Sequence, residues 1–166
     1  MMEEQPQALI SYQVDEAGWA DLRVSAQPQP LDFSVSFLHD SLGDLAHMGL
    51  ALQNGATKAK AVFMCEPGEV MLVVTGAKNV LQYELREYSD WASWGLVAMD
   101  DHMVVARGEI QRHELVRNIH EILQRIDVEV GAKQYREMWI AHDFPQQDYE
   151  SLSIALHQRC NVSTEK

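Results

Sequence analysis

Residues 60–88 read KAVFMCEPGEVMLVVTGAKNVLQYELREY and hold three short runs rich in apolar residues, separated by two turn segments. The runs are residues 60–65, 70–75 and 80–88, and the turns are 66–69 (EPGE) and 76–79 (GAKN). Turns this short join antiparallel neighbours. The stretch therefore predicts an antiparallel meander. Its middle run is apolar on both faces, which is typical of a strand covered on both sides.

The residues before the meander predict further strands and a helix. Alternating runs at 9–14 and 19–26 predict a hairpin, and residues 31–37 predict another short strand. Apolar residues then recur every three or four positions from residue 38 to 54, which predicts an amphipathic helix. Gly49 lies inside that apolar stripe, where it costs about 1 kcal/mol relative to alanine. We therefore expect another backbone to approach the helix closely at Gly49.

The residues after the meander predict one more strand, within 96–107, followed by helices at 112–130, at 132–140 and from about Pro145 onward. Strands and helices are thus grouped rather than alternating, which predicts an α+β fold. We expect an antiparallel sheet of about five to six strands with helices packed on one face. The 166 residues predict a single domain over 1–166, with residues 1–7 and 159–166 as flexible tails.

Acidic residues outnumber basic ones by 25 to 13, which gives a formal net charge of −12. Nucleic-acid binding draws on Lys and Arg, so this balance argues against a nucleic-acid partner. Residues 1–57 hold eight acids and one base, Arg23, and so carry −7 of the total (8 minus 1). An acidic face can steer a basic protein partner. The alternative is that the acidity serves solubility alone.

The chain shows no feature of export or of membrane insertion. No run approaches 18 apolar residues, and the first residues are acidic and polar rather than a positive start before an apolar stretch. Cys65 and Cys160 lie 95 positions apart without a CxxC or zinc spacing. We expect a cytoplasmic protein with two free thiols and no membrane contact; a Cys65–Cys160 disulfide is the alternative.

Known catalytic and metal motifs fail at identifiable positions. No two of the seven histidines stand three or four residues apart, and the two partial HExxH motifs have Arg117 and Gln124 where the second histidine should be. GxSxG and the phosphate-binding GxxxxGK[ST] are absent. The sequence predicts no catalytic residue, no metal and no cofactor, and favours a non-enzymatic protein.

Two tryptophans, Trp91 and Trp94, occur in one short segment with polar neighbours. Tryptophan is enriched at the energetic centres of protein interfaces. The alternative is that the rings fold back and seal the protein's own core. We predict Trp91 and Trp94, together with Asp40 and Asp44 of the acidic part, as partner-binding residues.

Residues 33–45 (FSVSFLHDSLGDL) and the EPGE turn at 66–69 resemble small uncharacterised bacterial α+β proteins. Some proteins of that build are immunity proteins, which neutralise a toxin. The resemblance covers about half of the chain in outline and carries over no catalytic residue. It implies an immunity-like interaction module that presents an acidic face to a protein partner.

Other functions stay open. A small-molecule binding module would hold an apolar pocket between sheet and helices, lined by aromatics and by the methionines at 64, 71, 99, 103 and 138. An enzyme would need a site that no known motif describes. Exposed sheet edges would also permit a homodimer.

Overall fold

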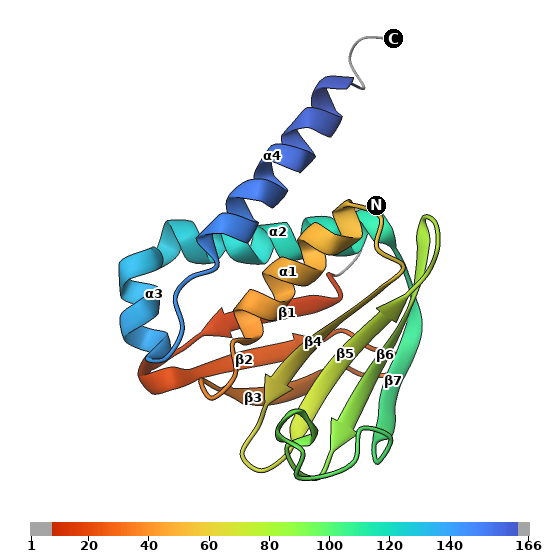
Figure 1. Cartoon of the computed structure of the whole chain (residues 1–166), viewed down its shortest axis with the longest axis vertical. Helices are drawn as coiled ribbons and strands as arrows, with labels where there is room; N and C mark the ends of the chain where they lie inside the picture. Colours follow the sequence, from red (N-terminus) through yellow and green to blue (C-terminus); the bar gives the residue numbers. More distant parts are fainter. Residues whose placement is uncertain (1–7, 163–166) are drawn as a thin grey trace, which may run out of the picture.

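The computed structural model describes residues 8–162 and the side chains of residues 8–158. These residues form seven strands in two antiparallel sheets, and four α-helices (Figure 1). The predicted α+β class is confirmed. The strands are divided between two sheets, whereas a sheet of five to six strands was expected.

The first sheet contains β1 (Ile10–Val14), β2 (Trp19–Val24) and β3 (Leu31–Ser36), in that spatial order. The predicted hairpin is confirmed, with Tyr12 opposite Leu22. Side chains alternate along these strands, so both residues are buried while the polar residues between them are exposed.

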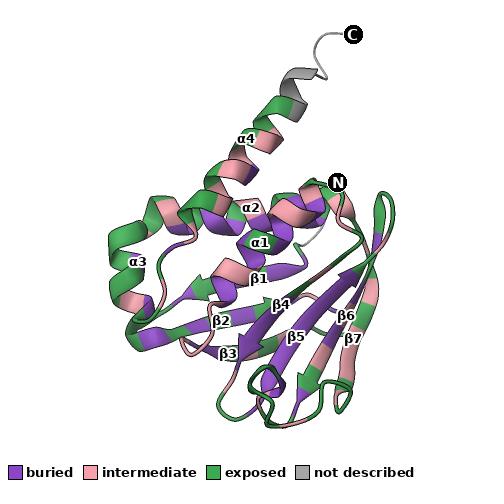
Figure 2. Ribbon diagram, viewed as in Figure 1, coloured by how far each residue is buried: buried purple, intermediate pink, exposed green. Residues whose placement is uncertain are grey.

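The second sheet contains β4 (Lys58–Met64), β5 (Glu69–Thr75), β6 (Val80–Tyr88) and β7 (Met103–Gln111), in that spatial order. The predicted meander is confirmed. Strand β5 is buried along nearly its whole length, as Figure 2 shows. Its residues Val70, Leu72 and Val74 join the main core, and Met71 and Val73 join a smaller cluster on the opposite face.

A carboxylate lies at the edge of the second sheet that faces β3. The Val62 backbone N–H of β4 donates to the carboxylate of Asp44 at 3.0 Å instead of to a strand. Strand β3 comes close to β4 but does not form a ladder with it. The Asp44 carboxylate of α1 thus satisfies a backbone donor of β4 at the boundary between the two sheets.

The helices are α1 (Ser41–Gln53), α2 (Arg112–Glu129), α3 (Ala132–Trp139) and α4 (Gln146–Val162). Helix α1 begins three residues later than expected because Asp40 caps it, accepting from the Gly43 N–H at 3.1 Å. Helix α4 continues to Val162, four residues into the expected tail, and extends away from the two sheets (Figure 1). Residues 1–7 and 163–166 lie outside the described residues.

Helix α2 covers the free edge of β1 with side-chain hydrogen bonds. The buried Asn118 amide accepts from the Ile10 N–H and donates to the Ile10 carbonyl, both at 2.9 Å. Arg125 donates to the Tyr12 carbonyl in the same way. An exposed strand edge is a template for pairing with other chains, so these contacts protect it.

The close approach expected at Gly49 is present, but side chains rather than a backbone make it. A Cβ at this position would lie 2.9 Å from Ile119 Cγ2 of α2 and 3.1 Å from Leu152 Cδ2 of α4. The glycine therefore lets three helices pack together.

Among residues 8–162, no helix combines the length and apolar character that a membrane crossing would require.

Arg112, the first residue of α2, connects three separate parts of the chain. Its guanidinium donates to four carbonyl oxygens, at distances from 2.7 to 3.0 Å, namely those of Leu52, Ala56, Gly76 and Lys78. Leu52 lies in the last turn of α1, where a cation is favourable, and its carbonyl also accepts from the Gly55 N–H at 3.1 Å. The other acceptors belong to the segment before β4 and to the β5–β6 turn.

Replacing Arg112 with methionine should lower the free energy of unfolding by about 2–4 kcal/mol, because four carbonyls lose a charged donor. Arg112→Lys should recover only part of the loss, since an ammonium cannot reproduce the guanidinium geometry. Urea unfolding would measure both variants. Arg107→Met, at an exposed position on β7, is the matched control and should change stability by less than about 0.5 kcal/mol. Equal losses at 107 and 112 would contradict this role.

Candidate partner-binding surface

The segment between β6 and β7, residues 89–102, folds back over the second sheet. It forms a short 3-10 turn at Ala92–Trp94. Ala92 packs with Val62, Met71 and Val73 on the face of the sheet opposite the main core. The strand predicted within 96–107 therefore begins only at Met103, because the preceding residues cover this apolar face.

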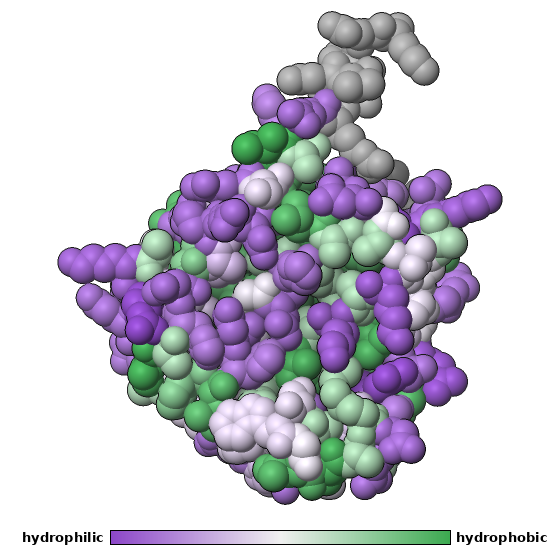
Figure 3. Space-filling model, viewed as in Figure 1, coloured by the Kyte–Doolittle hydropathy of each residue, from purple (hydrophilic) through white to green (hydrophobic). Residues whose placement is uncertain are grey.

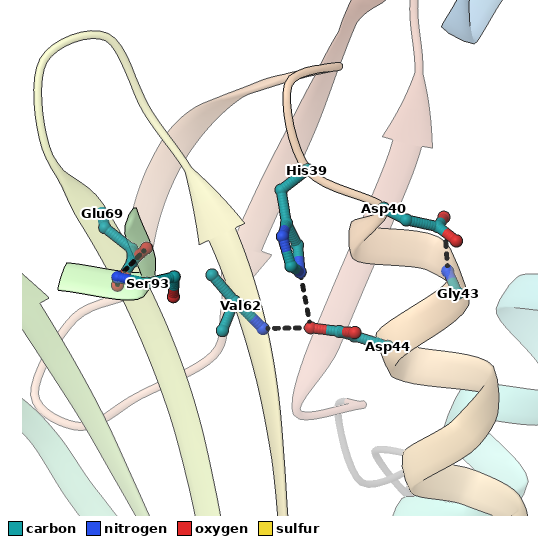
Figure 4. A network of polar contacts seen from close by, with 7 residues as sticks. All are labelled: His39, Asp40, Gly43, Asp44, Val62, Glu69 and Ser93. Atoms are coloured by element: carbon teal, nitrogen blue, oxygen red, sulfur yellow. Dashed lines mark hydrogen bonds and ion pairs between the residues drawn. The ribbon is translucent and has the colours of Figure 1, made fainter. Parts of the chain in front are cut away.

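Three hydrogen bonds fix this loop to the sheet. The buried Glu69 carboxylate accepts from the Ser93 N–H at 3.2 Å, as Figure 4 shows. The Trp91 indole donates to the Cys65 carbonyl at 2.9 Å, and the Tyr88 hydroxyl donates to the Met99 carbonyl at 2.7 Å. The loop is thus held in one conformation by contacts spread along its length.

The two predicted tryptophans have different environments. Trp91 is half-buried and bonded to Cys65, whereas Trp94 is 53% exposed. Their rings contact edge to face, with centroids 4.8 Å apart and planes at 67°. Trp91 thus seals the protein's own structure, and it also supports the exposed ring of Trp94.

Trp94 belongs to an exposed apolar group, which we call the tryptophan-loop patch. Its members are 47–69% exposed and comprise Trp94, Leu96, Met99 and Met103. Apolar and pale side chains gather at the lower end of the molecule in Figure 3, where Figure 1 draws this loop. Leu96, Met99 and Met103 were not predicted as partner-binding residues, because a strand was expected within 96–107 and the two methionines were expected to line an apolar pocket. Their signal was a run of large apolar residues beside Asp100 and Asp101.

A hollow of about 480 Å³ lies beside Cys65, whose carbonyl accepts from Trp91. Trp19 and Phe33 of the first sheet line it, together with Asp32 and Glu66. Cys65 thus contacts the tryptophan loop through its carbonyl and also lines the hollow that contains Trp19 and Phe33. Trp19, which sequence reasoning also missed, is 37% exposed there.

The two predicted aspartates have roles within the chain. Asp44 accepts from the Val62 N–H and lies 2.8 Å from His39 Nε2, and Asp40 caps α1 (Figure 4). Burial, with the charge of Asp40 as a smaller cause, raises the pKa of the Tyr12 and Tyr135 hydroxyls. Both aspartates thus stabilise the end of α1 that faces β4 and the buried tyrosines.

The described residues contain one serine–histidine contact, between Ser153 Oγ and His120 Nε2 at 2.8 Å. The Ser153 hydroxyl also donates to the Tyr149 carbonyl at 2.9 Å, so the histidine is the donor in this contact. A general base would have to accept the serine proton instead. Burial raises the pKa of the Cys65 thiol to about 11, which keeps it protonated at neutral pH. Neither group is set up as a nucleophile.

Two other expectations for a site can be compared with the structure. Within residues 8–158, no group of three or more His, Cys, Asp or Glu side chains is placed to hold a metal ion. The methionines proposed to line a common apolar pocket are dispersed. Met64 and Met71 are buried in the second sheet, whereas Met99 and Met103 are exposed.

No family model matches the sequence, and no curated protein matches it. Among solved structures, a similar chain belongs to the CdiA-CT/CdiI toxin and immunity complex from Enterobacter cloacae. It is 9% identical, the alignment covers 69% of this chain and 99% of that chain, and the TM-score is 0.42. That complex pairs a toxin with an immunity protein, and some of the proteins that residues 33–45 and 66–69 resemble are immunity proteins.

The environments of the two tryptophans predict unequal effects on stability. Trp91→Ala should lower the free energy of unfolding by about 2–3 kcal/mol, since it removes packing and leaves the Cys65 carbonyl without a donor. Trp94→Ala should cost less than about 1 kcal/mol, because most of that ring already faces solvent. Chemical denaturation of the two single variants checks this. A large loss for Trp94→Ala would show that its ring serves folding rather than binding.

The pair of His39 and Asp44 predicts a pH dependence of stability. Burial lowers the pKa of His39, but the hydrogen bond to Asp44 and the charges of Asp44, Asp40 and Glu69 outweigh it, and the pKa is raised above 6.5. The folded protein then holds the proton more tightly than the unfolded chain. The protonated His39 therefore stabilises the folded protein fully below pH 6.5. This contribution is lost as the pH rises through the raised pKa of His39.

Unfolding free energies measured between about pH 5.5 and 8.5 would show this loss in the native protein. His39→Gln should remove that part of the slope. His113→Gln, at an exposed position of α2, is the matched control and should keep it. Identical pH profiles for the native protein and His39→Gln would refute the assignment.

Proposed function

We propose that this protein is a non-enzymatic interaction module of the toxin-immunity kind, which binds a protein partner through the tryptophan-loop patch. One observation carries the proposal. Large apolar side chains are exposed together on a loop that the Glu69, Trp91 and Tyr88 hydrogen bonds hold in place. Exposed apolar side chains that gather in one region of a protein surface are characteristic of an interaction site.

The fixed conformation of the loop favours binding. A flexible loop would lose conformational entropy on association, and a loop already ordered in the free protein avoids most of that cost. Trp94 is supported from behind by Trp91 and can insert into a partner with little rearrangement. Tryptophans in such settings are frequent energetic centres of interfaces.

The charges around the patch define the chemistry of the partner. Asp90, Asp100 and Asp101 are exposed and flank the apolar residues of the loop. Acidic residues at the rim of an interface raise the association rate of a basic partner. We infer a partner with an apolar pocket for Trp94 and Leu96, surrounded by Lys or Arg. The immunity-like role rests on the resemblance of residues 33–45 and 66–69.

A capture experiment with matched variants tests the proposed surface. The immobilised native protein is compared with Trp94→Ser/Leu96→Ser and with Val128→Ser/Ile154→Ser, which changes two exposed apolar residues of α2 and α4. A specific partner should be retained by the native protein and the control, and be lost about tenfold or more with the patch variant. Raising the salt from about 0.05 to 0.5 M should slow association. A partner held equally by all three proteins would reject this surface.

Co-expression separates an immunity role from other interactions. If the partner is a toxin, the native protein and the helix control should restore growth of cells that produce it, and the patch variant should fail. A captured partner that is harmless in cells would support the proposed interaction surface but would contradict the immunity role.

A further inference from the structure

A groove of about 560 Å³ lies between α2 and α4, with Gln53 of α1 also in its lining. Figure 1 shows these helices at the end of the molecule away from the loop between β6 and β7. Helix α2 contributes His113, Arg117, His120 and Gln124 to its lining. These positions are separated by four, three and four residues, so their side chains form one row along the helix. The row provides several nitrogen donors that face the same space.

The charge of the groove contrasts with that of the protein. The chain has 25 acidic residues, yet no acidic residue within 8–158 lines this groove. Arg117 is exposed and makes no ion pair or side-chain hydrogen bond with any described residue. Glu114 and Glu121, three residues before and four residues after Arg117 on α2, are also exposed, and neither makes an ion pair with it. Among residues 8–158, the guanidinium thus has no partner that would compete with an anionic ligand.

The opposite wall supplies an apolar, aromatic surface. The Tyr149 ring of α4 stacks on His120, with centroids 5.6 Å apart and planes at 30°. Ser153 holds the His120 ring through its hydrogen bond of 2.8 Å. Leu156 and His157 continue the wall along α4. A ligand in the groove would thus meet a fixed ring stack and an aliphatic side chain beside the cationic row.

We infer that this groove binds a small organic anion, a carboxylate or a phosphate monoester that carries an aromatic or aliphatic part, with Arg117 anchoring the anionic group. Guanidinium groups bind both kinds of anion through paired hydrogen bonds. The ring stack and Leu156 would cover the apolar part. The volume falls within the range of about 300–1,000 Å³ typical of small-molecule sites. This site is independent of the proposed protein interface.

Titration of the full chain with four probes tests the inference. The probes are phenyl phosphate, phenylacetate, inorganic phosphate and phenol, observed through the ring proton signals of His113, His120 and His157 in NMR spectra. At least one of the two aromatic anions should give saturable shifts, and their relative affinities identify the preferred anionic group. Inorganic phosphate and phenol should each bind more weakly than that anion, because phosphate lacks the apolar part and phenol lacks the anionic group.

Substitutions at three exposed positions test how the charge near the groove affects binding of the anion. Arg117→Gln should weaken binding of the aromatic anion about tenfold or more. Glu121→Gln should strengthen it a few-fold by removing a nearby negative charge. Arg107→Gln, which removes a distant cation on β7, should leave it unchanged. The inference is overturned if no probe shifts the histidines, if inorganic phosphate binds as well as the aromatic anions, or if the variants at 107 and 117 behave alike.

Discussion

The guanidinium of Arg112 is the contact on which the arrangement of helices and sheets depends. Its hydrogen bonds join the end of α1, the segment before β4 and the turn between β5 and β6. These four carbonyls would lose a charged donor if the guanidinium were removed. Because Arg112 also begins α2, the same residue fixes the direction in which that helix leaves the sheet. The groove along α2 and the covered edge of β1 both follow from this direction.

Helix side chains also determine where the two sheets end. Asn118 satisfies the edge of β1, and Asp44 satisfies an edge N–H of β4. Each places a side-chain group where a neighbouring strand would otherwise pair. Asp44 is thus engaged in contacts within the protein. The number of acidic residues in the sequence is therefore larger than the number of carboxylates available to a partner. The acidic groups that do remain exposed near the apolar patch, at 90, 100 and 101, come from a different part of the chain.

Local patterns were enough to predict most elements. The meander, the hairpin and the helix at 112–130 rest on side-chain periodicity and turn chemistry, which are properties of neighbouring residues. The division into two sheets was not predicted, because whether β3 and β4 pair depends on contacts between distant residues, such as that of Asp44 with Val62. The loop at 89–102 was taken partly for strand, since its apolar residues suit either a strand or a cover for β5. Trp94 was identified as a candidate from its residue type, but only the fold separates its environment from that of Trp91.

The close contact of Trp91 and Trp94 has an optical consequence. Two indole rings at this separation and inclination couple their electronic transitions, so the pair should contribute a split circular-dichroism band that isolated tryptophans lack. Trp139, which is fully buried, adds a separate and constant background. A change in the ring geometry at the patch would alter the split band while the rest of the spectrum stayed the same. The protein therefore carries an intrinsic spectroscopic reporter at the surface where we place its partner.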